Sequence, residues 1–269
     1  MSIMILSMKE KAIIGSLGVL IVAALVLQYT GALWAPANTG GSSTGDVTVT
    51  LLKNAGIMIE TGDMRIYVDP IDLPQSYRDK PADAVLITHD HGDHYQYASI
   101  NMVQKDGTIN VFPVMMDSEI TRHDGVGVAP GDEIMVGDIK VTAYYMYTFS
   151  PDGATPASHP RESGYCSYII DIGGFTIFHA GDSKLLPEYS ALTHTINVAC
   201  LPLGPGCQTM CDNEVVEVVR TIQPDYMIPI HYTADSFSNF NRIYKRSVES
   251  AGCTACMLEE FTSYSFETE

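Results

Sequence analysis

One six-residue segment of this sequence contains three histidines and two aspartates. It reads His89-Asp90-His91-Gly92-Asp93-His94. Imidazole and carboxylate donors together suit zinc, iron or manganese. His89 and His91 are expected to lie on one side of an extended turn and to bind one metal ion, while Asp93 and His94 turn toward a second. The segment therefore predicts a centre for two metal ions.

Further donors are expected where other strands end, because four donors from one loop do not complete two metal sites. His159 lies in a loop before a predicted strand, Asp182 follows another predicted strand, and His231 follows a third. These three residues are the predicted remaining ligands. The other polar candidates are expected to support the fold or to lie in loops and at the surface, namely Asp90, His179, His123 and His194.

Hydrophobic patterns predict the elements that position these donors. The apolar run 84–88 is typical of a strand buried on both faces, and it leads directly into His89. Asp69 ends an earlier predicted strand. It is expected either to hydrogen-bond to the segment 89–94, the metal loop, or only to end that strand. Residues 213–222 and 240–251 are the predicted helices. The remaining predicted strands are 47–52, 56–60, 64–69, 109–114, 139–146, 165–171, 175–179 and 225–230.

The order of the donors resembles the metallo-β-lactamase superfamily. Within it, the chain is similar to the uncharacterised metal-dependent hydrolases of the ascorbate-6-phosphate lactonase type. The resemblance runs from about Val47 nearly to the C-terminus, and it implies an α/β fold, an αββα sandwich with the metal ions at one edge of two sheets. The supporting segments are Val68-Asp69-Pro70, 82–88, His159-Pro160 with Gly164-Tyr165, 178–182, 201–204 and 229–232.

The resemblance also implies which donor binds which ion. It assigns His89, His91 and His159 to the first metal, Asp93, His94 and His231 to the second, and Asp182 to a position bridging both. Two regions depart from the family: Asn54-Ala55 stand where relatives often carry Gly-His, and Tyr145 stands where they tend to carry Asn. Both departures are expected to affect the identity of the substrate and not the metal centre.

The expected chemistry is hydrolysis by a hydroxide held between two divalent ions, with zinc the first expectation and manganese or iron the alternatives. Two ions that share a water lower its pKa from about 15.7 toward neutrality. Asp93 or Asp182 is expected to orient that hydroxide or to accept a proton. The scissile bond is expected to be an ester, lactone, amide or phosphodiester, and this chemistry needs no Ser or Cys nucleophile.

Two other functions compete with hydrolysis. A di-iron redox enzyme uses the same fold, but that variant normally carries Glu where this chain has His91. A membrane-tethered binding module with a metal site that only stabilises the fold is the second alternative. Seven candidate ligands argue against it, because a structural zinc site usually needs four.

The N-terminal 35 residues are expected to form a membrane anchor or a signal segment. Lys9 and Lys11 precede an uncharged run that is long enough to cross roughly 30 Å of hydrocarbon as a helix. Positive charge before the run predicts a cytoplasmic N-terminus and a domain outside the cytoplasm. Ala35-Pro36-Ala37 fits a cleavage site, so a secreted domain is the alternative. Residues 36–46 then form a flexible linker and residues 47–269 the hydrolase domain.

Charge and cysteine content narrow the expected partners. A formal net charge of -17 argues against a nucleic-acid-binding surface and leaves a small-molecule or lipid-like substrate. The close pairs Cys207/Cys211 and Cys253/Cys256 permit disulfides in an exported domain, or less favourably an extra zinc site. Cys166 and Cys200 lie in apolar runs and are expected to be buried free thiols.

Overall fold

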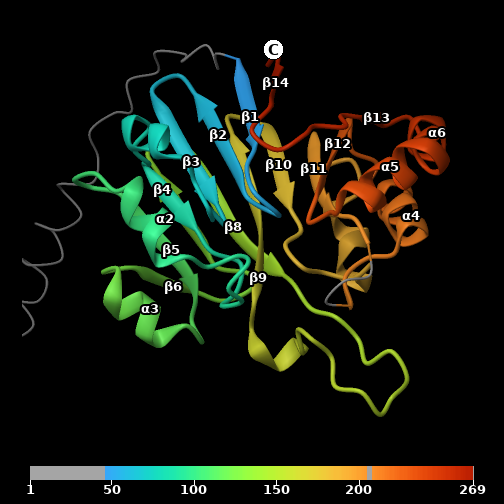
Figure 1. The fold of residues 1–269 in the computed structure, drawn as a ribbon, viewed down its shortest axis with the longest axis horizontal. Helices are drawn as coiled ribbons and strands as arrows, with labels where there is room; N and C mark the ends of the chain where they lie inside the picture. The colour runs from blue at the N-terminus through green and yellow to red at the C-terminus, as the bar shows by residue number, and fades with distance from the viewer. Residues whose placement is uncertain (1–45, 205–207, 269) are drawn as a thin grey trace, which may run out of the picture. The chain divides into compact units, whose positions relative to one another are not determined.

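The computed structural model describes residues 46–204 and 208–268. The predicted anchor at residues 1–35 and the linker up to residue 45 lie outside the described residues. No helix of the described ranges is long and apolar enough to cross a membrane. The described chain forms two seven-stranded sheets with helices around them (Figure 1).

The first sheet has the strand order β14-β1-β2-β3-β4-β5-β6. Its first four strands pair antiparallel, and the pairs from β3 to β6 are parallel. The strands are β1 Val47–Leu51, β2 Ile57–Thr61, β3 Met64–Val68, β4 Ala84–Leu86, β5 Ile109–Pro113, β6 Val126–Val128 and β14 Ser263–Phe266.

The second sheet has the order β13-β12-β11-β10-β9-β8-β7 and mixes pairings in the same way. The pairs from β10 to β13 are parallel and those from β7 to β10 antiparallel. The strands are β7 Glu133–Val136, β8 Ile139–Tyr145, β9 Cys166–Ile172, β10 Phe175–His179, β11 Val198–Pro202, β12 Tyr226–Ile230 and β13 Thr254–Ala255.

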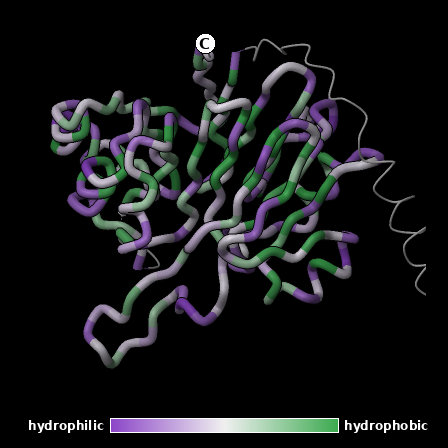
Figure 2. Tube along the Cα trace, turned by 180° about the vertical axis from the view of Figure 1, so that it is seen from behind, coloured by the Kyte–Doolittle hydropathy of each residue, from purple (hydrophilic) through white to green (hydrophobic). Residues whose placement is uncertain are grey.

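Alternation along the strands builds three apolar layers. In β2 and β3, side chains such as Ile57 and Ile66 enter the core between the sheets, whereas Met58 and Tyr67 join the cluster on the outer face of the first sheet. Phe178 of β10 points to the outer face of the second sheet. Hydrophobic residues follow the strands while turns are more polar (Figure 2). Strand periodicity of two thus produces two covered sheets.

Helices cover the two outer faces. The first sheet is covered by η1 Gln75–Asp79, α2 Tyr97–Met102 and α3 Asp117–Arg122. The second is covered by η3 Pro187–Leu192, α4 Asp212–Ile222, α5 Ala234–Ile243 and α6 Lys245–Ser250, and a short η2 Arg161–Ser163 lies before β9. This arrangement is the α/β sandwich that the sequence predicts (Figure 1).

The predicted helix at residues 240–251 is wrong in its bounds. A helix already begins at Ala234, because the Thr233 side chain accepts a hydrogen bond from Ser236 N and caps it. The helical segment then breaks at Tyr244, and α6 begins at Lys245. The predicted helix at 213–222 is confirmed as α4, one residue longer at its start.

The described cysteines are free thiols. Cys166, Cys200, Cys253 and Cys256 are buried and Cys211 is partly buried, and none of these five forms a disulfide. The Cys253–Cys256 disulfide that the sequence permits is therefore not formed, whereas Cys207 lies outside the described ranges. Burial raises the pKa of the Cys166 thiol to about 12, so this group stays protonated within the core.

Candidate metal centre

The predicted donors collect at one edge of the two sheets. His89 and its neighbours follow β4, Asp182 follows β10, and His231 follows β12. His159 comes from the long connection between β8 and β9. Since parallel strands end at a common edge, residues far apart in the sequence meet there. The structure brings all seven sequence-predicted donors together, while their role as ligands remains a prediction.

His89, His91 and His159 form the first group of donors. The Nε2 atom of His159 lies 3.3 Å from His89 Nε2 and 3.2 Å from His91 Nδ1. One donor atom from each residue falls within 4.8 Å of the others. The group therefore has the separation needed to hold one cation with three imidazole nitrogens.

Asp93, His94 and His231 form the second group. His231 Nε2 lies 3.4 Å from Asp93 Oδ2, and His94 Nε2 lies 3.9 Å from the same oxygen. The three donor atoms again lie within 4.8 Å of one another. The membership of both groups agrees with the assignment that the family resemblance implies.

Asp182 lies between the two groups. Its Oδ1 is 3.1 Å from His94 Nε2, and its Oδ2 is 3.3 Å from His231 Nε2 and 3.7 Å from His159 Nε2. The side chain is fully buried. Asp182 thus faces donors of both groups, as a bridging carboxylate must.

Unpaired polar atoms at this edge fit bound cations. His94 Nε2, both carboxylate oxygens of Asp182, and His231 Nε2 are buried and have no hydrogen-bond partner among the described residues. Burying such atoms without partners costs free energy, on the order of 1–3 kcal/mol for each group. Divalent metal ions would satisfy these atoms, and the donor set of imidazole and carboxylate suits them.

Burial and neighbouring charges set the protonation of the donors. Burial lowers the pKa of His159 to about 4 and also holds the pKa of His89 well below its ordinary value, aided by neighbouring imidazoles. Burial acts in the same direction on His94, but Asp182 and Asp69 outweigh it and raise its pKa well above the ordinary value. A cation binding at His94 would therefore compete with a proton.

Asp69 is the main supporting residue that the sequence left undecided. It is fully buried and accepts hydrogen bonds from Thr88 N at 2.8 Å, from the Thr88 hydroxyl at 2.6 Å and from His94 Nδ1 at 2.8 Å. Because that hydroxyl donates to Asp69, its oxygen accepts from His89 Nδ1 at 2.9 Å. Both imidazoles therefore turn their Nε2 atoms toward the centre.

The remaining polar candidates mostly lie where the sequence predicts. His179 is buried, donates from Nε2 to Ala55 O and supports the fold. Asp90 is exposed and accepts a hydrogen bond from the Tyr165 hydroxyl. His194 is exposed as expected. The surface position predicted for His123 is wrong, because the imidazole is half-buried, stacked on Phe112 and hydrogen-bonded to Tyr95.

Asn54 lies closer to the predicted donors than its sequence position indicates. It was expected to bear on the substrate alone, but its side-chain amide donates to Asp93 O at 2.9 Å and approaches Asp93 Oδ2 at 3.3 Å. Asn54 also lines a cavity of about 200 Å³ beside His231. The other residues of this cavity are Leu203, Gly204, Tyr232, Thr233 and Ser236.

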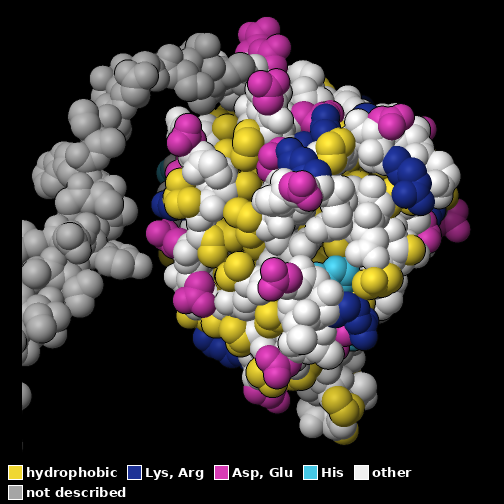
Figure 3. Space-filling view, turned by 90° about the vertical axis from the view of Figure 1, so that its left-hand side faces the viewer, with side chains coloured by type: hydrophobic (Ala, Val, Ile, Leu, Met, Phe, Trp, Pro, Cys, Tyr) yellow, Lys and Arg dark blue, Asp and Glu magenta, His cyan; other side chains and the backbone are white. Residues whose placement is uncertain are grey.

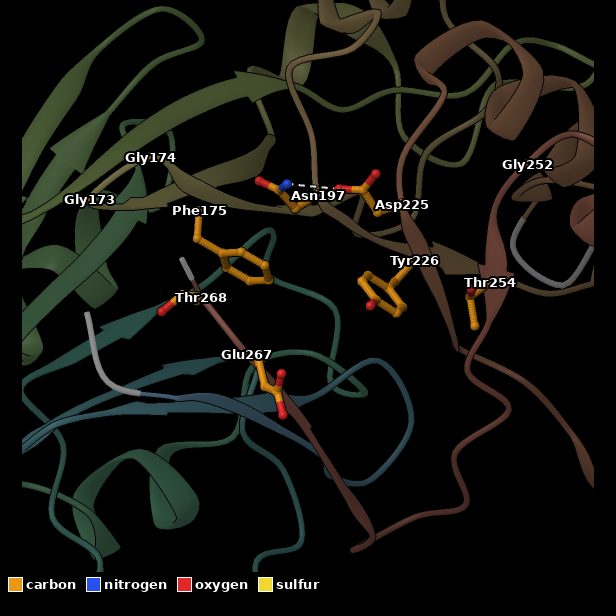
Figure 4. A pocket seen from close by; sticks show the side chains of 10 residues that line it. All are labelled: Gly173, Gly174, Phe175, Asn197, Asp225, Tyr226, Gly252, Thr254, Glu267 and Thr268. Atoms are coloured by element: carbon orange, nitrogen blue, oxygen red, sulfur yellow. Dashed lines mark hydrogen bonds between the residues drawn. The ribbon is translucent and has the colours of Figure 1, made fainter. Parts of the chain in front are cut away.

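A larger hollow of about 650 Å³ lies at the opposite edge of the second sheet (Figure 4). Phe175, Asn197 and Tyr226 line it at the starts of β10, β11 and β12, and Glu267 follows β14. The sequence-predicted donors all follow the ends of strands, or connect them, at the other edge. Size alone therefore does not identify the site.

A family model described as a beta-lactamase superfamily domain matches residues 48–231. This chain belongs to that superfamily. The matched residues span all seven donors, and the two-sheet architecture is the metallo-β-lactamase fold.

Among sequence relatives of this superfamily member is a metal-dependent hydrolase of Thermococcus kodakarensis from an uncharacterised protein family. It is 30% identical over 200 residues, covering 69% of this chain and 84% of the relative. A relative from Desulforamulus reducens, also called a metal-dependent hydrolase, is 26% identical over 216 residues, covering 77% of this chain and 93% of its own.

Solved structures give the same fold. A protein of Parabacteroides distasonis, named as a candidate metal-dependent hydrolase, has a TM-score of 0.68 and 27% identity, covering 78% of this chain and 92% of its own. The di-iron β-hydroxylase CmlA of Streptomyces venezuelae has a TM-score of 0.62 at 15% identity, covering 84% of this chain and 54% of its own. The second similarity concerns the fold alone.

Proposed function

We propose that this superfamily member is a metal-dependent hydrolase that uses two divalent ions to cleave an ester, lactone, amide or phosphodiester bond. The buried Asp182 carboxylate between two groups of three donors is the observation that carries this proposal. Relatives named metal-dependent hydrolases support the reaction class. The nitrogen-rich donor set favours zinc, with manganese or iron as alternatives.

The chemistry divides between the ions and the chain. Bound divalent ions would lower the pKa of a water from about 15.7 toward neutrality and polarise a carbonyl or phosphoryl oxygen. Asp182 orients the donors of both groups from its buried position. Asp93 is 47% exposed, and the His231 imidazole at 3.4 Å lowers its pKa, so it is an ionised carboxylate able to orient the attacking water or accept its proton.

His91 favours hydrolysis over di-iron redox chemistry. The redox variant of this fold normally has Glu at this position, whereas here an imidazole faces His159 at 3.2 Å. Three imidazoles in the first group give a donor set typical of zinc enzymes. A non-catalytic binding module needs no partly exposed carboxylate among its donors, whereas Asp93 is such a carboxylate.

A small-molecule or lipid-like substrate fits the surroundings of the centre. The cavity beside Asn54 and His231 has a volume of only about 200 Å³. Met115 is 66% exposed and packs beside Gly164, next to the Tyr165 ring that contacts His89. Nucleic acid is not expected, and Figure 3 shows Lys and Arg side chains only scattered among carboxylates on one face.

The predicted N-terminal anchor would hold the domain at a membrane outside the cytoplasm, or a cleaved signal would release it.

Elemental analysis of the full-length chain tests the proposal. The chain would be purified in mild detergent and its bound metals counted beside Asp182→Ala, with Asp90→Asn as the matched control in the exposed part of the loop. We expect about two zinc or manganese ions in the wild type and in the control, and fewer in Asp182→Ala. The loaded wild type would then be screened with ester, lactone, amide and phosphodiester substrates.

Other metal contents would change the conclusion. Two irons per chain would place the redox reaction ahead of hydrolysis. One tightly held ion that Asp182→Ala does not affect would overturn the two-ion mechanism and favour the binding module.

A further inference from the structure

We infer that Asn54 is a positioning residue that fixes Asp93 and His231, and thereby sets the affinity of the second metal site. This inference rests on the proposed two-ion centre. Asn54 lies in the turn between β1 and β2, far in sequence from both residues. Its side chain contacts Asp93, and its backbone carbonyl contacts His231.

The side chain of Asn54 holds Asp93. Its amide nitrogen donates to Asp93 O at 2.9 Å and lies 3.3 Å from Asp93 Oδ2. The same Oδ2 lies 3.4 Å from His231 Nε2. Because the amide donates both to the backbone carbonyl and to the carboxylate of Asp93, it restricts the rotation of that carboxylate.

The backbone of Asn54 holds His231. The Asn54 carbonyl accepts a hydrogen bond from His231 N at 3.0 Å. His231 has a φ of +52°, a left-handed conformation that is uncommon for a histidine and needs local support. Asn54 therefore joins a loop of the first sheet to the end of β12 in the second.

Asn54 is itself held in place. Its φ is +57°, which Asn and Gly tolerate better than other residues. Its N–H donates to Glu260 Oε1 at 3.4 Å, and Glu260 pairs with Lys53 at 2.9 Å. A Cβ on the nearby Gly56 would come within 2.8 Å of Asp69 O, so the turn packs tightly against Asp69 at the end of β3.

The second group of donors is the one that needs such support. Asp93 is 47% exposed, whereas the His94 side chain is fully buried and that of His231 is 12% exposed. An exposed carboxylate keeps several rotamers unless hydrogen bonds select one. Residues that orient a metal ligand change metal affinity by about 10–100-fold when they are removed.

Metal titration of the full-length chain after chelation tests this inference. Asn54→Gly removes the amide, yet glycine accepts the φ of +57° and keeps the carbonyl that binds His231 N. Gln223→Gly is the matched control, because Gln223 has a φ of +54° at the end of α4, away from the donors.

Cobalt(II) titration followed by its absorption spectrum resolves the two equivalents. We expect Asn54→Gly to bind the first equivalent as the wild type does and the second about 10–100-fold more weakly, with a changed spectrum for that ion. Gln223→Gly should match the wild type. Two equivalents bound by Asn54→Gly with wild-type affinity and spectrum would overturn this inference alone. A wild-type chain that fails to bind a second equivalent would overturn the proposed function as well.

Discussion

Single residues around the centre divide into donors and the groups that orient them. His89 and His94 owe their presented Nε2 atoms to one buried carboxylate, Asp69, acting directly and through the Thr88 hydroxyl. Without these hydrogen bonds, either nitrogen of each ring could carry the proton. The orientation of the donors therefore depends on residues that bind no metal themselves.

Asp69→Asn should weaken metal binding without removing a donor. An amide NH₂ facing His94 Nδ1 would favour the tautomer with its proton on Nε2, which points toward the centre. We expect zinc affinity to fall about 10–100-fold, measured by competition with a coloured chelator. Asp90→Asn, in the exposed part of the same loop, should keep wild-type affinity. Equal affinities for the wild type and Asp69→Asn would show that Asp69 only closes its strand.

At the scale of elements, close packing of strand ends places Asp182. Gly181 has a φ of +55°, and a Cβ there would lie 2.5 Å from Met146 Sδ and 3.2 Å from two Thr88 carbons. The turn after β10 and the start of the metal loop can therefore approach only because residue 181 has no side chain.

Gly181→Ala should lower both stability and metal content. Overpacking of this kind costs about 1–3 kcal/mol, and the shift would move Asp182 away from His94. Gly92→Ala is the matched control, because no atom lies within 4 Å of a Cβ at that position and its φ is not left-handed. Urea unfolding and elemental analysis give the two readouts. A Gly181→Ala protein as stable as Gly92→Ala would contradict the packing argument.

Glu214 stabilises the start of α4 in a pH-dependent way. It accepts hydrogen bonds from Cys211 N and Lys184 Nζ, each at 2.7 Å. Burial alone would raise the pKa of Glu214, but these bonds outweigh it and lower the pKa below its ordinary value. A carboxyl group whose pKa is lowered by folding adds stability at neutral pH, and this contribution is lost as the pH falls below about 4.3.

Glu214→Gln should therefore destabilise the protein by about 1 kcal/mol at pH 7 and by less near pH 4. Urea unfolding at both pH values measures the difference. Glu217→Gln on the same helix serves as a control, because Glu217 is half-exposed and pairs only with Arg220. A destabilisation that does not change between the two pH values would show that the charge of Glu214 is irrelevant.

At the scale of the whole molecule, the described domain presents its centre away from the start of its first strand. β1 begins at Val47, paired with Phe266, and runs toward the turn that holds Asn54. The donors gather at that far end of the strand. A chain entering at Val47 therefore joins the domain at the edge opposite the centre.

Deletion of residues 1–45 tests the predicted localisation. The described residues form one compact unit, so we expect the shortened chain to keep its metal content. It should move from the membrane fraction to the soluble fraction, because the apolar run is removed. A full-length chain found in the soluble cytoplasm would contradict both the anchor and the signal hypotheses. If the domain is recovered outside the cytoplasm with its first residues removed, this outcome would favour the cleaved signal.

The sequence alone predicted the seven donors that meet at one edge of the sheets and most of the strands that lead to them. Local patterns suffice for this, since period-two apolar runs and a dense His/Asp segment are properties of neighbouring residues. Short elements such as β6, β11 and β13 were not predicted. They have only two to five residues, and a segment of that length fits several structures. The start of α5 depended on a Thr233–Ser236 cap, which a helix search based on apolar spacing does not detect.

Only the tertiary structure decided how the donors are oriented and supported. The roles of Asn54 and Asp69, the half-buried state of His123 and the free thiol of Cys256 all depend on contacts between residues distant in the chain. Asn54 and His231 are separated in the sequence by all the strands from β2 to β12, yet a backbone hydrogen bond joins them. Such contacts exist only after two sheets pack and bring the ends of their strands to one edge, so no local pattern can specify them.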